Sequence, residues 1–313
     1  MQKIFLLLII SVTLRADEVL DSLARDVYLA SINSVIVFTS QDGLSSGIYR
    51  FTNIDTEMRM YNLPLQFHFD PLTEKSNLFL ILDMGYSDAY TDREIPVAEG
   101  ILHKDNRMQT YVAGIGIGIR YRTTEHSDIQ FGGELLYSRV GVTSKVGDGL
   151  SEDDIKNFFS SDFNDNYSYK LLAEYIYHRT INKHKVYVRV NYKLYQTLSE
   201  IKVGDIIEDI VGDIFSLRSQ TSVATAMLSY ESSPLYEYKE MAFTLEPFIK
   251  GNYIWGDLAA VAKINGYATL GVSAYWNTPE KSAYISRYFI EPSISKGYGI
   301  EGLNLSIGFS LDF

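Results

Sequence analysis

The chain ends with LNLSIGFSLDF, residues 303–313, in which every second residue is apolar and every residue between is small or polar. Successive side chains of a β-strand point to opposite faces, so this segment would form a strand with one fully apolar side. Globular strands usually have five or six residues, whereas a tilted strand needs about nine to eleven to cross a bilayer. The segment therefore predicts a membrane-crossing strand with its apolar side toward lipid.

The same period of two recurs upstream. Residues 111–121 place Tyr, Ala and Ile on one face and Gly and Arg on the other, and residues 186–194 place Val, Tyr and Leu opposite Arg189 and Lys193. Residues 63–69 repeat the arrangement. A charged side chain is costly in lipid, so the charged faces are expected to point into an enclosed lumen.

The whole chain, read in this way, predicts about twelve antiparallel strands. An even number is typical of single-chain bacterial barrels, and the predicted fold class is an all-β transmembrane antiparallel barrel with a short N-terminal helix. The strands are expected near residues 46–53, 57–69, 77–91, 108–122, 128–142, 167–180, 184–198, 218–231, 240–255, 264–276, 284–297 and 302–313.

The connections between these strands alternate in length. Those at 92–107, 143–166 and 199–217 are long and polar, whereas those at 123–127 and 181–183 are short. Outer-membrane barrels have short periplasmic turns and long external loops in the same alternation. Aromatic residues near the predicted strand ends favour a bilayer interface, although cross-strand packing in a soluble sheet would also explain single pairs.

The sequence predicts three segments, counted from the amino terminus. Residues 1–16 join a positive start to an apolar run of about ten residues, which is typical of a signal peptide and too short for a membrane-spanning helix. Residues 17–33 have apolar residues at steps of three and four, which predicts an amphipathic helix that plugs the lumen, lies in the periplasm or leads loosely into the barrel. The barrel is predicted to occupy residues 34–313.

Charge and composition limit the partners. A formal net charge of −11 argues against nucleic acid, which needs a basic surface. The chain has no cysteine, which excludes disulfides and cysteine metal sites, and neither a metal nor a cofactor is predicted. The expected partners are outer-membrane lipid, lipopolysaccharide and the barrel assembly machinery, around a monomer. The acidic loops at 143–166 and 199–217 indicate either simple solvation or cation bridging to lipopolysaccharide.

The predicted lumen carries both signs of charge. Mixed charges in a narrow barrel can pair and fill it, or they can line a selective channel. The predicted lumen charge network consists of Arg120, Arg122, Glu174, Arg189, Lys193, Glu246, Lys250, Arg287 and Glu291.

The chain combines a signal, a short helical lead, about twelve strands, the stretch VIVFTSQDGLSSG at 35–47 and an aromatic end. In this combination it resembles the β-barrel domain of bacterial autotransporters, more narrowly the solitary barrels without a passenger. The resemblance implies that Phe309, Leu311 and Phe313 form the signal that the outer-membrane assembly machinery of a Gram-negative bacterium reads. Secretion of a passenger is not expected, because about thirty residues of the mature chain precede the first predicted strand.

No catalytic residues are predicted. His103 is the histidine expected on the external side, with Asp88, Asp92 and Asp105 near it, and aspartates in a solvated loop are the simpler reading of this cluster. The expected function is therefore a non-enzymatic outer-membrane barrel with a structural or surface-interaction role. A porin-like channel for small solutes is the alternative, and a surface hydrolase is a weaker third.

Overall fold

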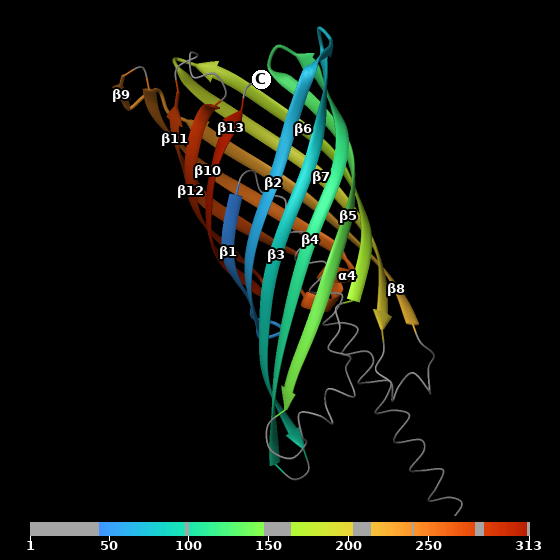
Figure 1. The fold of residues 1–313 in the computed structure, drawn as a ribbon. Helices are drawn as coiled ribbons and strands as arrows, with labels where there is room; N and C mark the ends of the chain where they lie inside the picture. The colour runs from blue at the N-terminus through green and yellow to red at the C-terminus, as the bar shows by residue number, and fades with distance from the viewer. Residues whose placement is uncertain are drawn as a thin grey trace, which may run out of the picture.

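The computed structural model describes residues 44–97, 100–146, 164–202, 214–239, 241–278 and 285–311, which form one large sheet and a short helix (Figure 1). The predicted signal peptide, the predicted helix at 17–33 and residues 34–43 lie outside this part of the chain. No helix in the described ranges is long and apolar enough to cross a membrane.

The strands follow one another along the chain in the predicted order. The first seven are β1 Leu44–Phe51, β2 Thr56–Thr73, β3 Ser76–Val97, β4 Gly100–Thr124, β5 Ser127–Val146, β6 Asn164–Ile181 and β7 His184–Lys202. The others are β8 Ile214–Glu231, β9 Tyr236–Tyr238, β10 Met241–Gly256, β11 Gly266–Asn277, β12 Ile285–Gly297 and β13 Ile300–Leu311, and the helix α4, Asp257–Ala262, joins β10 to β11.

The sheet closes on itself. Consecutive strands pair antiparallel, β8 pairs with β10, and β13 returns to pair with β1. The short strand β9 pairs only with the start of β10 within the described chain. The structure therefore confirms an all-β barrel of twelve antiparallel strands, with β9 and α4 as additions that the period of two did not predict.

The two faces of the wall have opposite polarity. Large apolar side chains cover the outside, and Ile115, Ile117 and Leu135 are 57%, 58% and 69% exposed. Charged and polar side chains such as Asp83, Glu134 and Lys170 are buried inside the barrel. A water-soluble protein would hide the first set and expose the second, so this wall is built for an apolar surrounding.

Aromatic residues form rows on the outer wall. Tyr61, Tyr86 and Tyr111 lie opposite one another on three neighbouring strands, with ring centroids 6.2 Å and 5.0 Å apart. Beyond this row the outer face becomes charged, and the Arg107 guanidinium donates two hydrogen bonds of 2.8 Å to the Asp88 carboxylate. An aromatic row followed by charges is the order of side chains expected where a barrel leaves a bilayer.

The outer wall gives a first prediction. Ile117 lies on β4 near the midpoint between the outward residues Tyr111 and Tyr121, so Ile117→Arg is expected to lower the unfolding free energy by roughly 2–4 kcal/mol in lipid vesicles. Gln109→Arg, on the same face but beside Asp88, is the control and should change it by less than about 0.5 kcal/mol. Urea unfolding of both variants in vesicles measures the difference, and equal midpoints would contradict a lipid-facing Ile117.

One predicted loop is wrong. Residues 92–97 and 100–107 belong to strands, because β3 and β4 remain paired residue by residue from Ser76 opposite Tyr121 as far as Val97 opposite Gly100. This long hairpin projects beyond the barrel at the bottom of Figure 1. The strands also take up both ends of the other two predicted loops, because β5 ends at Val146, β6 begins at Asn164, β7 ends at Lys202 and β8 begins at Ile214. Residues 147–163 and 203–213 lie outside the described residues. The end of the barrel that carries the hairpin and α4 is called the loop end here, and the opposite end the turn end.

Candidate functional site

An apolar layer, which we call the cap, crosses the lumen at the loop end. Its members come from β1 to β5, β7, β8, β10, β13, α4 and the residues after α4, so nearly the whole circumference contributes. Buried apolar side chains that meet across a lumen exclude water and ions from it. The cap consists of Tyr49, Phe51, Met58, Met60, Ala89, Met108, Val112, Leu136, Val140, Tyr195, Val223, Ile254, Leu258, Ala259, Ala262, Ile264 and Ile300.

Hydrogen bonds fasten α4 over the mouth of the barrel. The Asp257 carboxylate accepts a hydrogen bond of 2.7 Å from the backbone amide of Gln220, and the Asn53 side chain donates one of 2.8 Å to the backbone carbonyl of Lys263. Gly299 has φ +78°, and any side chain there would collide with Asn53. The turns β1–β2 and β12–β13 and the helix therefore form one connected lid.

Directly beneath the cap lies a buried ionic trio. The Lys170 ammonium is 2.7 Å from the Asp83 carboxylate and also contacts Glu134, and the three side chains are 7%, 3% and 0% exposed. A side chain at Gly114 would collide with Glu134, so the absence of one on β4 makes room for this carboxylate. Removing one partner from such a group leaves an uncompensated buried charge.

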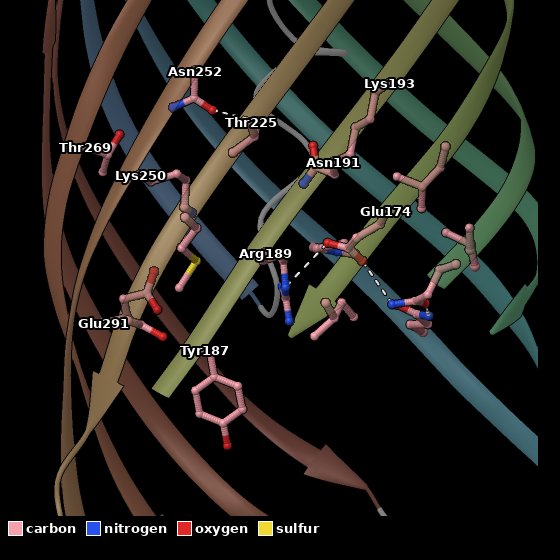
Figure 2. Close-up of a pocket in the computed structure, with 18 of the residues that line it drawn as sticks. Glu174, Tyr187, Arg189, Asn191, Lys193, Thr225, Lys250, Asn252, Thr269 and Glu291 are labelled. Carbon is pink, nitrogen blue, oxygen red and sulfur yellow. Dashed lines mark hydrogen bonds and ion pairs between the residues drawn. The ribbon is translucent and has the colours of Figure 1, made fainter. Parts of the chain in front are cut away.

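A cavity of about 540 Å³ lies below the trio inside the barrel. Figure 2 shows one wall of it, where Arg189, Asn191 and Lys193 of β7 face the lumen near Lys250 and Asn252 of β10. The neighbouring strand β6 adds an acidic side chain to this wall, because Glu174 lies opposite Asn191 in the register. Glu174 lies 3.4 Å from Arg189 and accepts a hydrogen bond of 2.9 Å from Gln130.

The wall formed by β7, β8 and β10, which we call the basic wall, is ordered by the sheet register. Asn191, Thr225 and Asn252 lie opposite one another on β7, β8 and β10, and the Thr225 hydroxyl donates a hydrogen bond of 2.9 Å to the Asn252 side chain. The Lys250 ammonium lies 5.3 Å from the centroid of the Phe248 ring. The wall therefore combines cations with amide and hydroxyl groups, which could hold a carboxylate or a phosphate group.

Two further acidic residues organise the turn end. Glu231 is buried, lies 3.0 Å from Arg287 and 3.5 Å from Lys185, and accepts a hydrogen bond of 2.9 Å from Thr244. Three strands away, on β5, the Asp128 carboxylate lies 2.7 Å from the Arg120 guanidinium and 3.7 Å from His178 Nε2. Each carboxylate is thus paired with an arginine, Glu231 with Arg287 of β12 and Asp128 with Arg120 of the adjacent strand β4.

The predicted lumen charges divide into two groups. Arg122 stands at the rim of the turn end, where its side chain is 66% exposed and 4.0 Å from Asp128. The Glu246 carboxylate accepts a hydrogen bond from Ser229, and Glu291 accepts one of 2.6 Å from Ser273. The predicted lumen charges that line the cavity are Arg120, Glu174, Arg189, Lys193, Glu246, Lys250, Arg287 and Glu291.

The prediction missed the most deeply buried charges. The signal was present, because Asp83 stands between the outward residues Leu82 and Met84, and Lys170 between Tyr169 and Leu171. The same alternation that placed Arg189 inward places these two inward as well. The charges that it could have added are Asp83, Asp128, Glu134, Lys170 and Glu231.

The other predicted residues are placed as follows. Phe309 and Leu311 lie in β13, opposite Tyr288 and Ile285, and Phe313 lies outside the described chain. Of the cluster around His103, Asp88 is bound by Arg107, and the backbone of His103 pairs with that of Glu94. Among the described residues, no three histidine, aspartate or glutamate side chains group as metal ligands.

The Glu231 cluster gives a second prediction. Arg287 also stacks on Tyr275, with its guanidinium carbon 4.2 Å from the ring centroid. Arg287→Ala removes one of two cations from a buried carboxylate, so we expect a loss of about 1–3 kcal/mol in unfolding free energy, measured by urea titration in detergent micelles. Arg287→Ala combined with Glu231→Gln should recover part of the loss, and a double variant less stable than the single one would contradict the pairing.

Comparison with known proteins supports the architecture. No family model matches the sequence, and no curated protein matches it either. Three solved structures superimpose on most of the chain. The β domain of the Bordetella autotransporter BrkA does so with a TM-score of 0.59 at 10% identity, covering 86% of this chain and 97% of that one.

The other two are similar. The translocator domain of NalP from Neisseria meningitidis has a TM-score of 0.53 at 12% identity and covers 96% of this chain and 99% of its own. The transport unit of AIDA-I from Escherichia coli has a TM-score of 0.55 at 10% identity, with 88% and 92% covered. At such low identity the likeness speaks for the fold. The protein therefore has the twelve-stranded barrel fold of autotransporter translocator domains.

Proposed function

We propose that the protein is a non-enzymatic integral outer-membrane barrel of autotransporter-like type, with a structural or surface-interaction role and no passenger in this sequence. The cap is the observation that carries the proposal, because a lumen crossed by buried apolar side chains presents a barrier to ions. The apolar outer wall and the shared fold support the membrane location. The β3–β4 hairpin, which extends beyond the barrel at the loop end, is the part best placed to meet other molecules outside the cell.

The partners follow from the same proposal. Outer-membrane lipid and lipopolysaccharide would surround the apolar wall and the charged residues beyond the tyrosine row. The assembly machinery would read the end of β13, where Phe309 and Leu311 lie. The chain would act as a monomer, since its sheet closes on itself and leaves β9 as a short additional edge.

A channel for small solutes is the second candidate, and the charged cavity of about 540 Å³ favours it. Reconstitution of the purified protein into planar bilayers separates the two. A capped barrel is expected to insert, as judged by heat-modifiable migration in gels, and to show no stepwise ionic conductance. Regular conductance steps from inserted protein would overturn the capped barrel in favour of the channel.

A further inference from the structure

The connection between β8 and β10 differs from the other described turns at its end of the barrel. Those at 74–75, 125–126 and 182–183 have two residues, whereas this one runs from Ser232 to residue 240 and contains β9. It is held in place, because the Ser233 amide donates a hydrogen bond of 3.0 Å to His184 Nδ1 and the Leu235 amide donates one of 2.9 Å to the Phe243 carbonyl. The segment is therefore an ordered projection.

The tip of this projection is apolar and uncovered. Leu235, Tyr236 and Tyr238 are 58%, 64% and 56% exposed, and the Lys239 ammonium lies 5.2 Å from the centroid of the Tyr238 ring. Figure 1 shows β9 at the outer edge of the turn end, away from the lumen. Residues 235–239 are called the turn-end anchor below.

The sheet register joins this anchor to the outer wall. Tyr236 lies opposite Phe243, Phe243 opposite Trp276, and Trp276 opposite Tyr288, while the rings of Phe243 and Trp276 are 5.2 Å apart. Residues directly opposite one another share a face of the sheet, and Trp276 and Tyr288 are exposed on the outer face. The aromatic row of the barrel wall thus continues onto β9, one strand beyond the wall.

We propose that the turn-end anchor docks onto the lipid headgroup region of the leaflet at the turn end. This inference rests on the proposed outer-membrane location. Tyrosine places an apolar ring and a polar hydroxyl at a bilayer interface, and the Lys239 ammonium can pair with a lipid phosphate. Continuity with the aromatic row of the lipid-facing wall favours lipid over a protein partner. The outward face of the wall continues onto β9, so the anchor would lie in the headgroup region directly beside the part of the wall that contacts lipid.

The test uses the two tryptophans of the chain, Trp255 and Trp276. Replacing both by Phe and introducing Tyr236→Trp gives one fluorophore on the anchor, and retaining Trp255 with Trp276→Phe gives the matched control on the wall. Each protein is reconstituted into phosphatidylcholine vesicles that contain a headgroup spin-labelled lipid. We expect the fluorescence of the Tyr236→Trp protein to be quenched by the lipid label as strongly as that of the Trp255 control, and to be less accessible to aqueous iodide than in the urea-unfolded protein.

The outcomes distinguish the two proposals. Quenching of the Trp255 control without quenching of the anchor fluorophore, which iodide then reaches freely, would overturn the anchor and leave the membrane barrel intact. Failure of both proteins to be quenched would overturn the membrane location and the anchor with it.

Discussion

Lys170→Met is expected to destabilise the barrel by about 3–5 kcal/mol, because the variant leaves the carboxylates of Asp83 and Glu134 buried beside each other without a cation. The Lys170 ammonium contacts both carboxylates, and all three side chains are almost fully buried within the barrel. The measurement is the urea midpoint of unfolding from detergent micelles, followed by tryptophan fluorescence.

Two further variants are the controls for Lys170→Met. Lys296→Met makes the same substitution at an ion pair with Glu301 in which the lysine side chain is 82% exposed, and it should cost less than about 1 kcal/mol. The triple variant Asp83→Asn, Glu134→Gln and Lys170→Met removes every charge of the trio and should recover at least half of the loss. Equal midpoints for Lys170→Met and Lys296→Met would show that the trio contributes nothing special.

Truncation of the largest cap side chains to alanine is expected to turn a non-conducting barrel into a conducting one. Tyr49, Tyr195 and Leu258 are among its largest fully buried side chains, and they come from β1, β7 and α4. The triple variant to Ala removes their bulk from three sides of the lumen, while the strand ladders that close the barrel are left in place. Planar bilayers should then show stepwise conductance where the parent protein shows none.

The matched control removes the same kinds of side chain from the outer wall. Tyr61, Tyr253 and Leu135 are exposed there, and their replacement by Ala should leave the barrel silent. Truncation of a buried side chain to Ala typically costs 2–5 kcal/mol, so heat-modifiable migration must show that the cap variant is folded. A folded, inserted cap variant without conductance would contradict the cap as the barrier.

The period of two predicted the barrel because lipid and lumen impose opposite polarity on alternate residues. It predicted β7 and the part of β4 from residue 108 onward well, since both have apolar residues on one face and Gly, Arg, Asn or Lys on the other. The rule fails where strands leave the lipid. On β2 the outward residues Glu57 and Arg59 are exposed and charged, whereas the inward Met58 and Met60 belong to the cap, so the polarity is reversed.

The additions at the two ends were harder to predict for different reasons. A helix of six residues such as α4 has little intrinsic stability. It is held by Leu258, Ala259 and Ala262, which pack against the other members of the cap. The outer part of the β3–β4 hairpin lies beyond the tyrosine row and projects past the barrel, so no lumen imposes an alternation of polarity on its sequence. The ion pairs of the lumen depend on which strands lie side by side and in which register. The sequence alone does not give this, and only the folded sheet shows that Lys170, Asp83 and Glu134 meet.

The central claim is that the apolar face of each strand contacts lipid, and β8 allows a direct test. The chain has no cysteine, so single cysteines can be introduced one at a time at residues 223–230 and labelled with a nitroxide. In vesicles, the account predicts that collisions with oxygen rise at Ala224, Ala226, Leu228 and Tyr230 and fall at the residues between them, with a period of two. Uniform accessibility to a water-soluble nickel complex along the segment would contradict it.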